Sequence, residues 1–156
     1  MAFSLFGKGQ KVDNSAYDLM LSGLLSHSVQ EVSVEEVEVN ENILFVDARE
    51  KNEYKVSHLK DAVWVGYDRL NLKPIQKVDR NKEIIVYCSV GYRSEKVAEK
   101  LKAEGFTNVK NLYGGIFEWV NKGNTIYNMD GDSTKKIHAY NKVWGIWLSK
   151  GEKMYD

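Results

Sequence analysis

Short apolar runs alternate with helical patterns through the centre of the chain. Residues 43–46 and 84–87 are continuously apolar, reading Ile-Leu-Phe-Val and Ile-Ile-Val-Tyr. Runs that are apolar on both faces are typical of parallel strands covered by helices on both sides. Residues 62–65 and 109–112 are two weaker strand candidates. The pattern therefore predicts several short, buried strands.

Helical patterns separate these runs. Residues 94–104 repeat apolar side chains at helical spacing, and Gly105 follows where a C-terminal cap is expected. Shorter helices are predicted at residues 50–56 and 115–121. Strands that alternate with helices at this spacing predict an α/β fold with a central parallel sheet flanked by helices.

The two ends of the chain differ from this centre. Residues 15–28 place apolar side chains at near-helical spacing and predict an amphipathic helix after a flexible lead over residues 1–14. A polar stretch, residues 124–134, precedes a tail that carries Trp144 and Trp147. We expect this tail to pack on the central domain, with a partner-docking surface as the alternative. The expected division is a lead and helix over 1–31, a domain over 32–123 and an aromatic extension over 124–156.

Composition excludes several classes of function. Lys plus Arg total 22 and Asp plus Glu total 22, and this balance argues against a nucleic-acid partner or a polybasic membrane surface. No apolar run approaches the ~20 residues of a membrane span, so a reducing, cytoplasmic setting is expected. The single cysteine, Cys88, excludes an internal disulfide and multi-cysteine metal sites. We expect no metal and no cofactor.

The segment from Tyr87 to Ser94 is the most informative for chemistry. It reads Tyr-Cys-Ser-Val-Gly-Tyr-Arg-Ser, beginning where a buried strand ends and finishing where a helix begins. Inward-facing loop amides, the positive end of the helix and Arg93 all favour a thiolate at Cys88. A lone cysteine at a strand end is more often a small buried hydrophobe. The loop context, with Gly91 suited to a tight turn, favours the reactive interpretation.

The chain resembles the single-domain rhodanese family of sulfurtransferases. Four motifs in the family's order carry the resemblance over roughly residues 32–123: Phe45-Val46-Asp47-Ala48-Arg49-Glu50, Ser57-His58-Leu59-Lys60-Asp61-Ala62, Val86-Tyr87-Cys88-Ser89-Val90-Gly91-Tyr92-Arg93-Ser94 and Val109-Lys110-Asn111-Leu112-Tyr113-Gly114-Gly115-Ile116. The resemblance implies the rhodanese-like three-layer α/β fold.

The resemblance also implies a reaction. Cys88 would take the sulfane sulfur of an anionic donor such as thiosulfate and pass it to cyanide, a thiol or a protein acceptor. Arg93 would anchor the loop and orient the donor. The substrate-binding loop that would stabilise the persulfide comprises Ser89, Val90, Gly91, Tyr92 and Ser94.

Four further residues are expected to support the site. By the resemblance, Asp47 and Arg49 lie at its edge. Arg49 and Glu53 are also spaced as an i, i+4 pair on a short helix, which makes a structural role at least as attractive. His58 matches the family's histidine, and we interpret it as a structural hydrogen-bonding residue rather than a catalytic base.

Two other functions compete with sulfur transfer by an enzyme. Phosphatases and arsenate reductases on the same fold have one more residue between cysteine and arginine, whereas four residues separate Cys88 from Arg93 here. This short loop suits a sulfur atom and argues against a phosphatase. A sulfur carrier or partner-binding module with little thiosulfate activity stays open, because Ser89 stands where efficient thiosulfate users often carry a basic residue.

Overall fold

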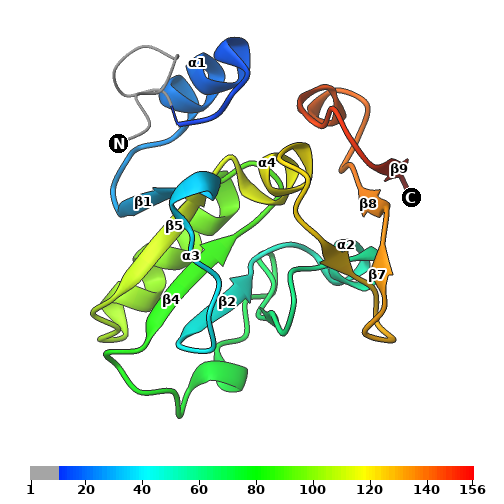
Figure 1. The fold of residues 1–156 in the computed structure, drawn as a ribbon. Helices are drawn as coiled ribbons and strands as arrows, with labels where there is room; N and C mark the ends of the chain where they lie inside the picture. Colours follow the sequence, from blue (N-terminus) through cyan, green and yellow to red (C-terminus); the bar gives the residue numbers. More distant parts are fainter. Residues whose placement is uncertain (1–10) are drawn as a thin grey trace.

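A five-stranded parallel sheet forms the centre of the molecule (Figure 1). The computed structural model describes residues 11–156, so most of the predicted lead lies outside the described residues. The strand order is β1-β5-β4-β2-β3, and every neighbouring pair is parallel. The strands are β1 Gln30–Ser33, β2 Ile43–Asp47, β3 Val63–Trp64, β4 Glu83–Tyr87 and β5 Val109–Tyr113.

Four of these strands match the sequence prediction, and β1 was missed. Strand β1 lies at the edge of the sheet and pairs only with β5. It reads Gln-Glu-Val-Ser, with one apolar residue, Val32, among polar ones. An edge strand with so little apolar surface has no run or alternation by which a sequence pattern reveals it.

Four α-helices accompany the sheet: α1 Ser15–Leu24, α2 Lys51–Val56, α3 Tyr92–Ala103 and α4 Gly115–Asn121. Helix α1 ends four residues before the predicted limit, because Leu25 is extended and His27 takes a positive φ of 56°. Helix α3 begins two residues earlier than predicted, directly after Gly91. Helix α4 has the predicted bounds.

The sheet buries a core on each face, as the doubly apolar strands predict. Phe45, Ile85 and Leu112 point to the face covered by α1, α4 and the C-terminal segment. The alternating residues Val46, Ile84 and Val86 point to the face covered by α3. This alternation produces three layers, with the sheet in the middle.

The C-terminal region consists of short elements rather than a loop and a tail: β6 Ile126–Tyr127, β7 Ser133–Thr134, β8 Lys136–His138, the 3₁₀ turn η3 Trp144–Trp147 and β9 Glu152–Met154. Strands β6 and β7 are antiparallel, and β8 and β9 are parallel. The predicted polar loop therefore contains β6 and β7.

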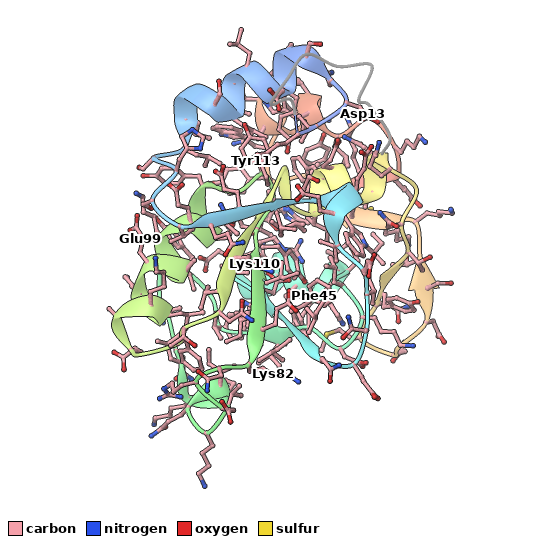
Figure 2. The ribbon with its side chains drawn as sticks, turned by 60° about the vertical axis from the view of Figure 1, so that its left-hand side comes forward. Asp13, Phe45, Lys82, Glu99, Lys110 and Tyr113 are labelled. Carbon is pink, nitrogen blue, oxygen red and sulfur yellow. The ribbon has the colours of Figure 1, made fainter. Side chains whose placement is uncertain are left out.

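Helix α1 and the C-terminal turn η3 are in contact. Tyr17 of α1 stacks on Trp147 of η3 with ring centroids 5.2 Å apart. The Tyr17 hydroxyl donates to the Gly114 carbonyl at 2.6 Å. Figure 2 shows α1 crossing above Tyr113, whose hydroxyl donates to the Asp18 carbonyl at 3.4 Å. Helix α1 is thus joined to the C-terminal end of β5, and the C-terminal segment packs on α1.

Neither a membrane-spanning helix nor a metal-binding cluster is found in the described part of the chain. Over residues 11–156, no helix has the length and apolar character that crossing a membrane requires. The same residues contain no group of three or more His, Cys, Asp or Glu side chains placed to hold a metal ion.

Candidate active site

Cys88 lies directly after β4, at the C-terminal edge of the parallel sheet. Its Sγ accepts a hydrogen bond from the Gly91 N–H at 3.1 Å. Gly91 has a φ of 134°, a conformation that favours glycine, and immediately precedes α3. The loop therefore turns one backbone donor toward the sulfur, next to the positive end of a 12-residue helix.

A hydroxyl also faces the sulfur. Ser94 Oγ lies 3.3 Å from Cys88 Sγ and 2.6 Å from Asn111 Oδ1. Asn111 Nδ2 in turn donates to the Gly91 carbonyl at 3.0 Å, which fixes the direction of its amide. Because the Ser94 hydroxyl has one proton, it can donate to only one of these two acceptors at a time. Ser94 thus lies within hydrogen-bonding distance of both the sulfur and the Asn111 amide oxygen.

Helix α4 holds the outer side of the loop. The Ile116 and Phe117 N–H groups donate to the Cys88 and Ser89 carbonyls at 2.9 and 3.1 Å. Gly115, with a φ of 61°, allows this approach, since a Cβ there would lie 2.6 Å from the Cys88 carbonyl oxygen. The loop carbonyls are therefore engaged by α4 and do not face the sulfur.

Arg93 and Glu53 form the main ion pair of the site. Arg93 Nη1 and Nη2 donate to the two carboxylate oxygens of Glu53 at 2.7 and 2.9 Å. Arg93 Nη2 also donates to Ser89 Oγ at 2.9 Å. The side chains are 12% and 2% exposed, so the guanidinium anchors the loop to α2 in a mostly buried, bidentate pair.

The pKa values of both partners follow from this pairing. Burial by itself would raise the pKa of Glu53, but the Arg93 hydrogen bonds and charge outweigh it and lower that pKa. Burial would likewise lower the pKa of Arg93, and the hydrogen bonds to Glu53 and the nearby Cys88 raise it instead. Both groups are therefore charged at neutral pH.

Asp47 and Arg49 form a second ion pair beneath the site. The two side chains are fully buried, and Arg49 Nη2 donates to Asp47 Oδ2 at 2.7 Å. Tyr87 also donates to Asp47 Oδ2, at 2.7 Å, which ties β4 to β2. The expected pairing of Arg49 with Glu53 is wrong: Arg49 pairs with Asp47, and Glu53 pairs with Arg93.

His58 lies apart from the sulfur, in the contact between α2 and β6. Its Nδ1 is 2.9 Å from the Tyr54 carbonyl, and its ring stacks on Tyr54 with centroids 4.1 Å apart. Its backbone pairs with Tyr127 in both directions at 2.9 Å. His58 therefore makes local hydrogen-bonding and stacking contacts, and its structural role stays a prediction.

A cavity of about 220 Å³ opens above Cys88. Its lining residues are Leu24, Cys88, Ser89, Val90, Tyr92, Arg93, Tyr140 and Trp144. Of the residues expected at the site, the cysteine and four others of the loop line this cavity. Gly91, Ser94 and Glu53 support the loop from behind, while Asp47, Arg49 and His58 lie elsewhere.

Sequence reasoning missed four residues of the site. Leu24, Tyr140 and Trp144 line the cavity from the terminal segments, and Asn111 orients Ser94 from β5. The aromatic character of the tail was the available signal for Tyr140 and Trp144, but their position above the loop depends on tertiary packing. The sequence pointed to Asn111 only weakly, as a polar residue in the middle of a predicted strand.

The comparisons with known proteins agree with this geometry. The family model described as the rhodanese-like domain matches residues 33–122, more than half of the chain. A Bacillus halodurans protein of known structure is 26% identical, with a TM-score of 0.58 over 74% of this chain and 86% of its own. A thiosulfate sulfurtransferase from Pseudomonas aeruginosa shares the fold at 23% identity, with a TM-score of 0.57 over 67% of this chain and 21% of its own.

The curated relatives with similar sequences are named tRNA uridine(34) hydroxylase. The protein from Hamiltonella defensa is 40% identical over 93 residues, covering 53% of this chain and 26% of its own length. The protein from Yersinia pestis is 30% identical over 116 residues, covering 71% of this chain and 32% of its own length. The chain thus spans about a quarter to a third of these relatives.

The chain belongs to the rhodanese-like domain family. The predicted three-layer α/β fold with a central parallel sheet is confirmed by the strand order and by the structural neighbours. The family and its cysteine loop support an enzymatic role of the sulfurtransferase kind.

Proposed function

We propose that the protein transfers sulfane sulfur through a persulfide on Cys88. In the first half-reaction the Cys88 thiolate attacks the outer sulfur of a donor such as thiosulfate. A new S–S bond forms at Sγ, the S–S bond of the donor breaks, and sulfite leaves with the electron pair. In the second half-reaction a thiophilic acceptor removes the outer sulfur and regenerates the thiolate.

The observation that carries this proposal is the environment of Cys88 Sγ. The Gly91 N–H points at the sulfur from 3.1 Å, Ser94 Oγ lies 3.3 Å away, and Cys88 lines the cavity. Donors placed in this way stabilise negative charge on sulfur in both the thiolate and the persulfide. With one cysteine in the chain, the persulfide has no internal thiol to resolve it, so the sulfur passes to an external acceptor.

The contacts of Arg93 suggest that the site binds thiosulfate weakly. Its guanidinium is held by both oxygens of Glu53 and by Ser89, so its charge is compensated before a donor arrives. Arg93 is also the one cation among the described residues that line the cavity. We therefore keep, as the alternative, a sulfur carrier or partner-binding module with little thiosulfate activity of its own.

The hydroxylase named for the relatives is a less favoured function. Those proteins are named for a tRNA nucleoside, but this chain spans 26–32% of their length. Its formal charge is zero, which disfavours a nucleic-acid partner. We propose a small sulfur compound as the substrate and a reducing, cytoplasmic setting. Saturable binding of tRNA to the full chain in a gel-shift assay would contradict this preference.

Mass spectrometry of the intact protein tests the persulfide directly. After incubation with thiosulfate or inorganic polysulfide, we expect the mass of one added sulfur, which cyanide removes. The Cys88→Ala variant should gain none, while Ser149→Ala, at an exposed position in the tail, should behave as the wild type. Loading by polysulfide alone would favour the carrier alternative. If neither donor adds sulfur at Cys88, the proposed function is wrong.

A further inference from the structure

The cavity above Cys88 has walls from two sources. Ser89, Val90, Tyr92 and Arg93 come from the cysteine loop, whereas Leu24 comes from α1 and Tyr140 and Trp144 come from the C-terminal segment. These last three residues lie outside residues 33–122, the part matched by the family. The cavity is therefore a chamber with two parts: the cysteine loop, which belongs to the family match, and the terminal segments, which complete its walls.

The segment after α1 is fixed to the core, which gives Leu24 a defined position. The fully buried Glu95 of α3 accepts hydrogen bonds from the Ser26 and His27 N–H groups, both at 2.9 Å. In the C-terminal segment, the Tyr140 ring packs against Arg93, with 5.1 Å between its centroid and the guanidinium carbon. Both walls are thus tied to α3, the helix that follows the cysteine loop.

The chemistry of the walls is apolar and aromatic. Leu24, Val90, Tyr92, Tyr140 and Trp144 contribute five of the eight lining side chains. Arg93 is compensated by Glu53 and covered by Tyr140. An inorganic anion would leave these walls in contact with water, whereas an apolar body would remove them from it.

The size of the cavity suits a ring. A cavity of about 150 Å³ lined by aliphatic and aromatic side chains holds benzene, and the volume here is about 220 Å³. A single aromatic ring with a short substituent therefore fits above Cys88 with its substituent directed to the sulfur.

We propose that this cavity binds a thiol acceptor with a neutral, ring-sized apolar body, an inference that rests on the proposed persulfide chemistry. The acceptor thiolate attacks the outer sulfur of the Cys88 persulfide. A bond forms between the two sulfurs, the Sγ–S bond breaks, Cys88 leaves as a thiolate with the electron pair of that bond, and the acceptor becomes a persulfide. No external oxidant or reductant is needed, because the transferred sulfur keeps its oxidation state when it moves from one persulfide to the other.

The test measures the second half-reaction alone. The protein is loaded with inorganic polysulfide, desalted and mixed with phenylmethanethiol or 2-mercaptoethanol, two alkyl thiols that differ in the apolar ring. Loss of sulfur from Cys88 is followed by rapid quench and mass spectrometry. Burial of the ring should give phenylmethanethiol a roughly ten- to hundredfold higher second-order rate constant, after normalisation to thiolate concentration.

Substitutions in the cavity walls test whether the preference for phenylmethanethiol arises in this cavity. Trp144→Ala in the C-terminal segment and Leu24→Ala in α1 should each reduce the ratio of the two rate constants at least threefold. Val143→Ala is the matched control, since Val143 neighbours Trp144, is 72% exposed and does not line the cavity. A ratio within a single protein does not depend on the fraction that is folded.

The outcomes separate this inference from the proposed function. Failure to load sulfur contradicts both. Loading followed by equal rate constants for the two thiols overturns the apolar acceptor and leaves the persulfide chemistry intact. A preference that is unchanged in both wall variants also overturns it. Discharge only by a cysteine-bearing protein would identify the chamber as a docking site for a side chain and would contradict a small-molecule acceptor.

Discussion

At the residue scale, the pairing of Arg93 with Glu53 changes the interpretation of the loop arginine. The two residues are 40 positions apart, and their hydrogen bonds join α2 to the cysteine loop. A bidentate pair of this kind uses the guanidinium for positioning. We therefore infer that Arg93 positions the loop, in addition to the charge it places near Cys88.

Removal of the Glu53 charge tests this role. Glu53→Gln leaves the Arg93 cation largely buried without its anion, which should lower the free energy of unfolding at pH 7 by about 3 kcal/mol. Urea denaturation measures the effect. Glu83→Gln is the control, because its pair with Lys110 is more exposed and should contribute about 0–1 kcal/mol. Equal losses in the two variants would argue against a special role for the buried pair.

The pH dependence of this loss has a definite sign. Because the folded-state pKa of Glu53 is lowered, its stabilising effect is present above the unfolded value of about 4.3 and is lost as pH falls through the lower folded value. The difference between wild type and Glu53→Gln should therefore be largest near neutral pH and shrink below about pH 4. Urea titrations at a series of pH values would show it, and a constant difference would contradict the assignment.

At the scale of elements, the contact between α4 and the cysteine loop depends on backbone proximity. Gly115 brings the first N–H groups of α4 to the carbonyls of Cys88 and Ser89. The sequence motif marks the two glycines but not which backbone they approach. Gly115 is needed both for its positive φ and for its close contact with the loop carbonyls. Comparison with a second glycine that has a positive φ but no close contact separates the two requirements.

Gly115→Ala should disrupt the loop far more than its φ alone requires. A Cβ at this position meets the Cys88 carbonyl at 2.6 Å, whereas one at Gly123, with a similar need for positive φ of 84°, meets nothing within 4 Å. Gly123→Ala should therefore cost about 1–2 kcal/mol of unfolding free energy from the left-handed conformation alone. Gly115→Ala should cost at least twice as much and slow persulfide formation. Chemical denaturation measures the unfolding free energy, and the loading assay measures the rate of persulfide formation. Similar values for the two variants would contradict a role for the close contact at Gly115.

Elements with strong local patterns were predictable. Strands β2 and β4 each contain a run of four apolar residues, and α4 is buried along nearly its whole length, so burial and the mostly apolar local sequence agree. Strand β1 was not predictable, because backbone pairing with β5 holds it rather than apolar content. The cysteine loop followed from its position between a strand and a helix, but Asn111 and the Glu53 partner of Arg93 depend on distant parts of the chain.

At the scale of the whole molecule, the Tyr17–Trp147 stack joins the terminal segments that carry the cavity walls. Stacked aromatic pairs contribute about 0.5–1.5 kcal/mol beyond the burial of their area. A double-mutant cycle with Tyr17→Leu and Trp147→Leu should give a coupling free energy of about 1 kcal/mol. Urea denaturation of the four proteins measures it.

A matched cycle provides the control for this coupling. Tyr17→Leu combined with Ile146→Ala changes an exposed neighbour of Trp147 that is 65% accessible to solvent. The two substitutions in that cycle should be additive within about 0.3–0.5 kcal/mol. Additivity in the Tyr17–Trp147 cycle as well would mean that the stack does not couple the two ends of the molecule.

The split origin of the chamber affects how function can be transferred between relatives. Similarity confined to residues 33–122 compares the cysteine loop and leaves out Leu24, Tyr140 and Trp144. Two proteins can therefore share the loop while differing in the walls above it. Under the proposed function, exchange of the terminal segments between homologues is expected to alter the acceptor without altering the nucleophile, so these segments are the natural place to engineer or to diversify specificity.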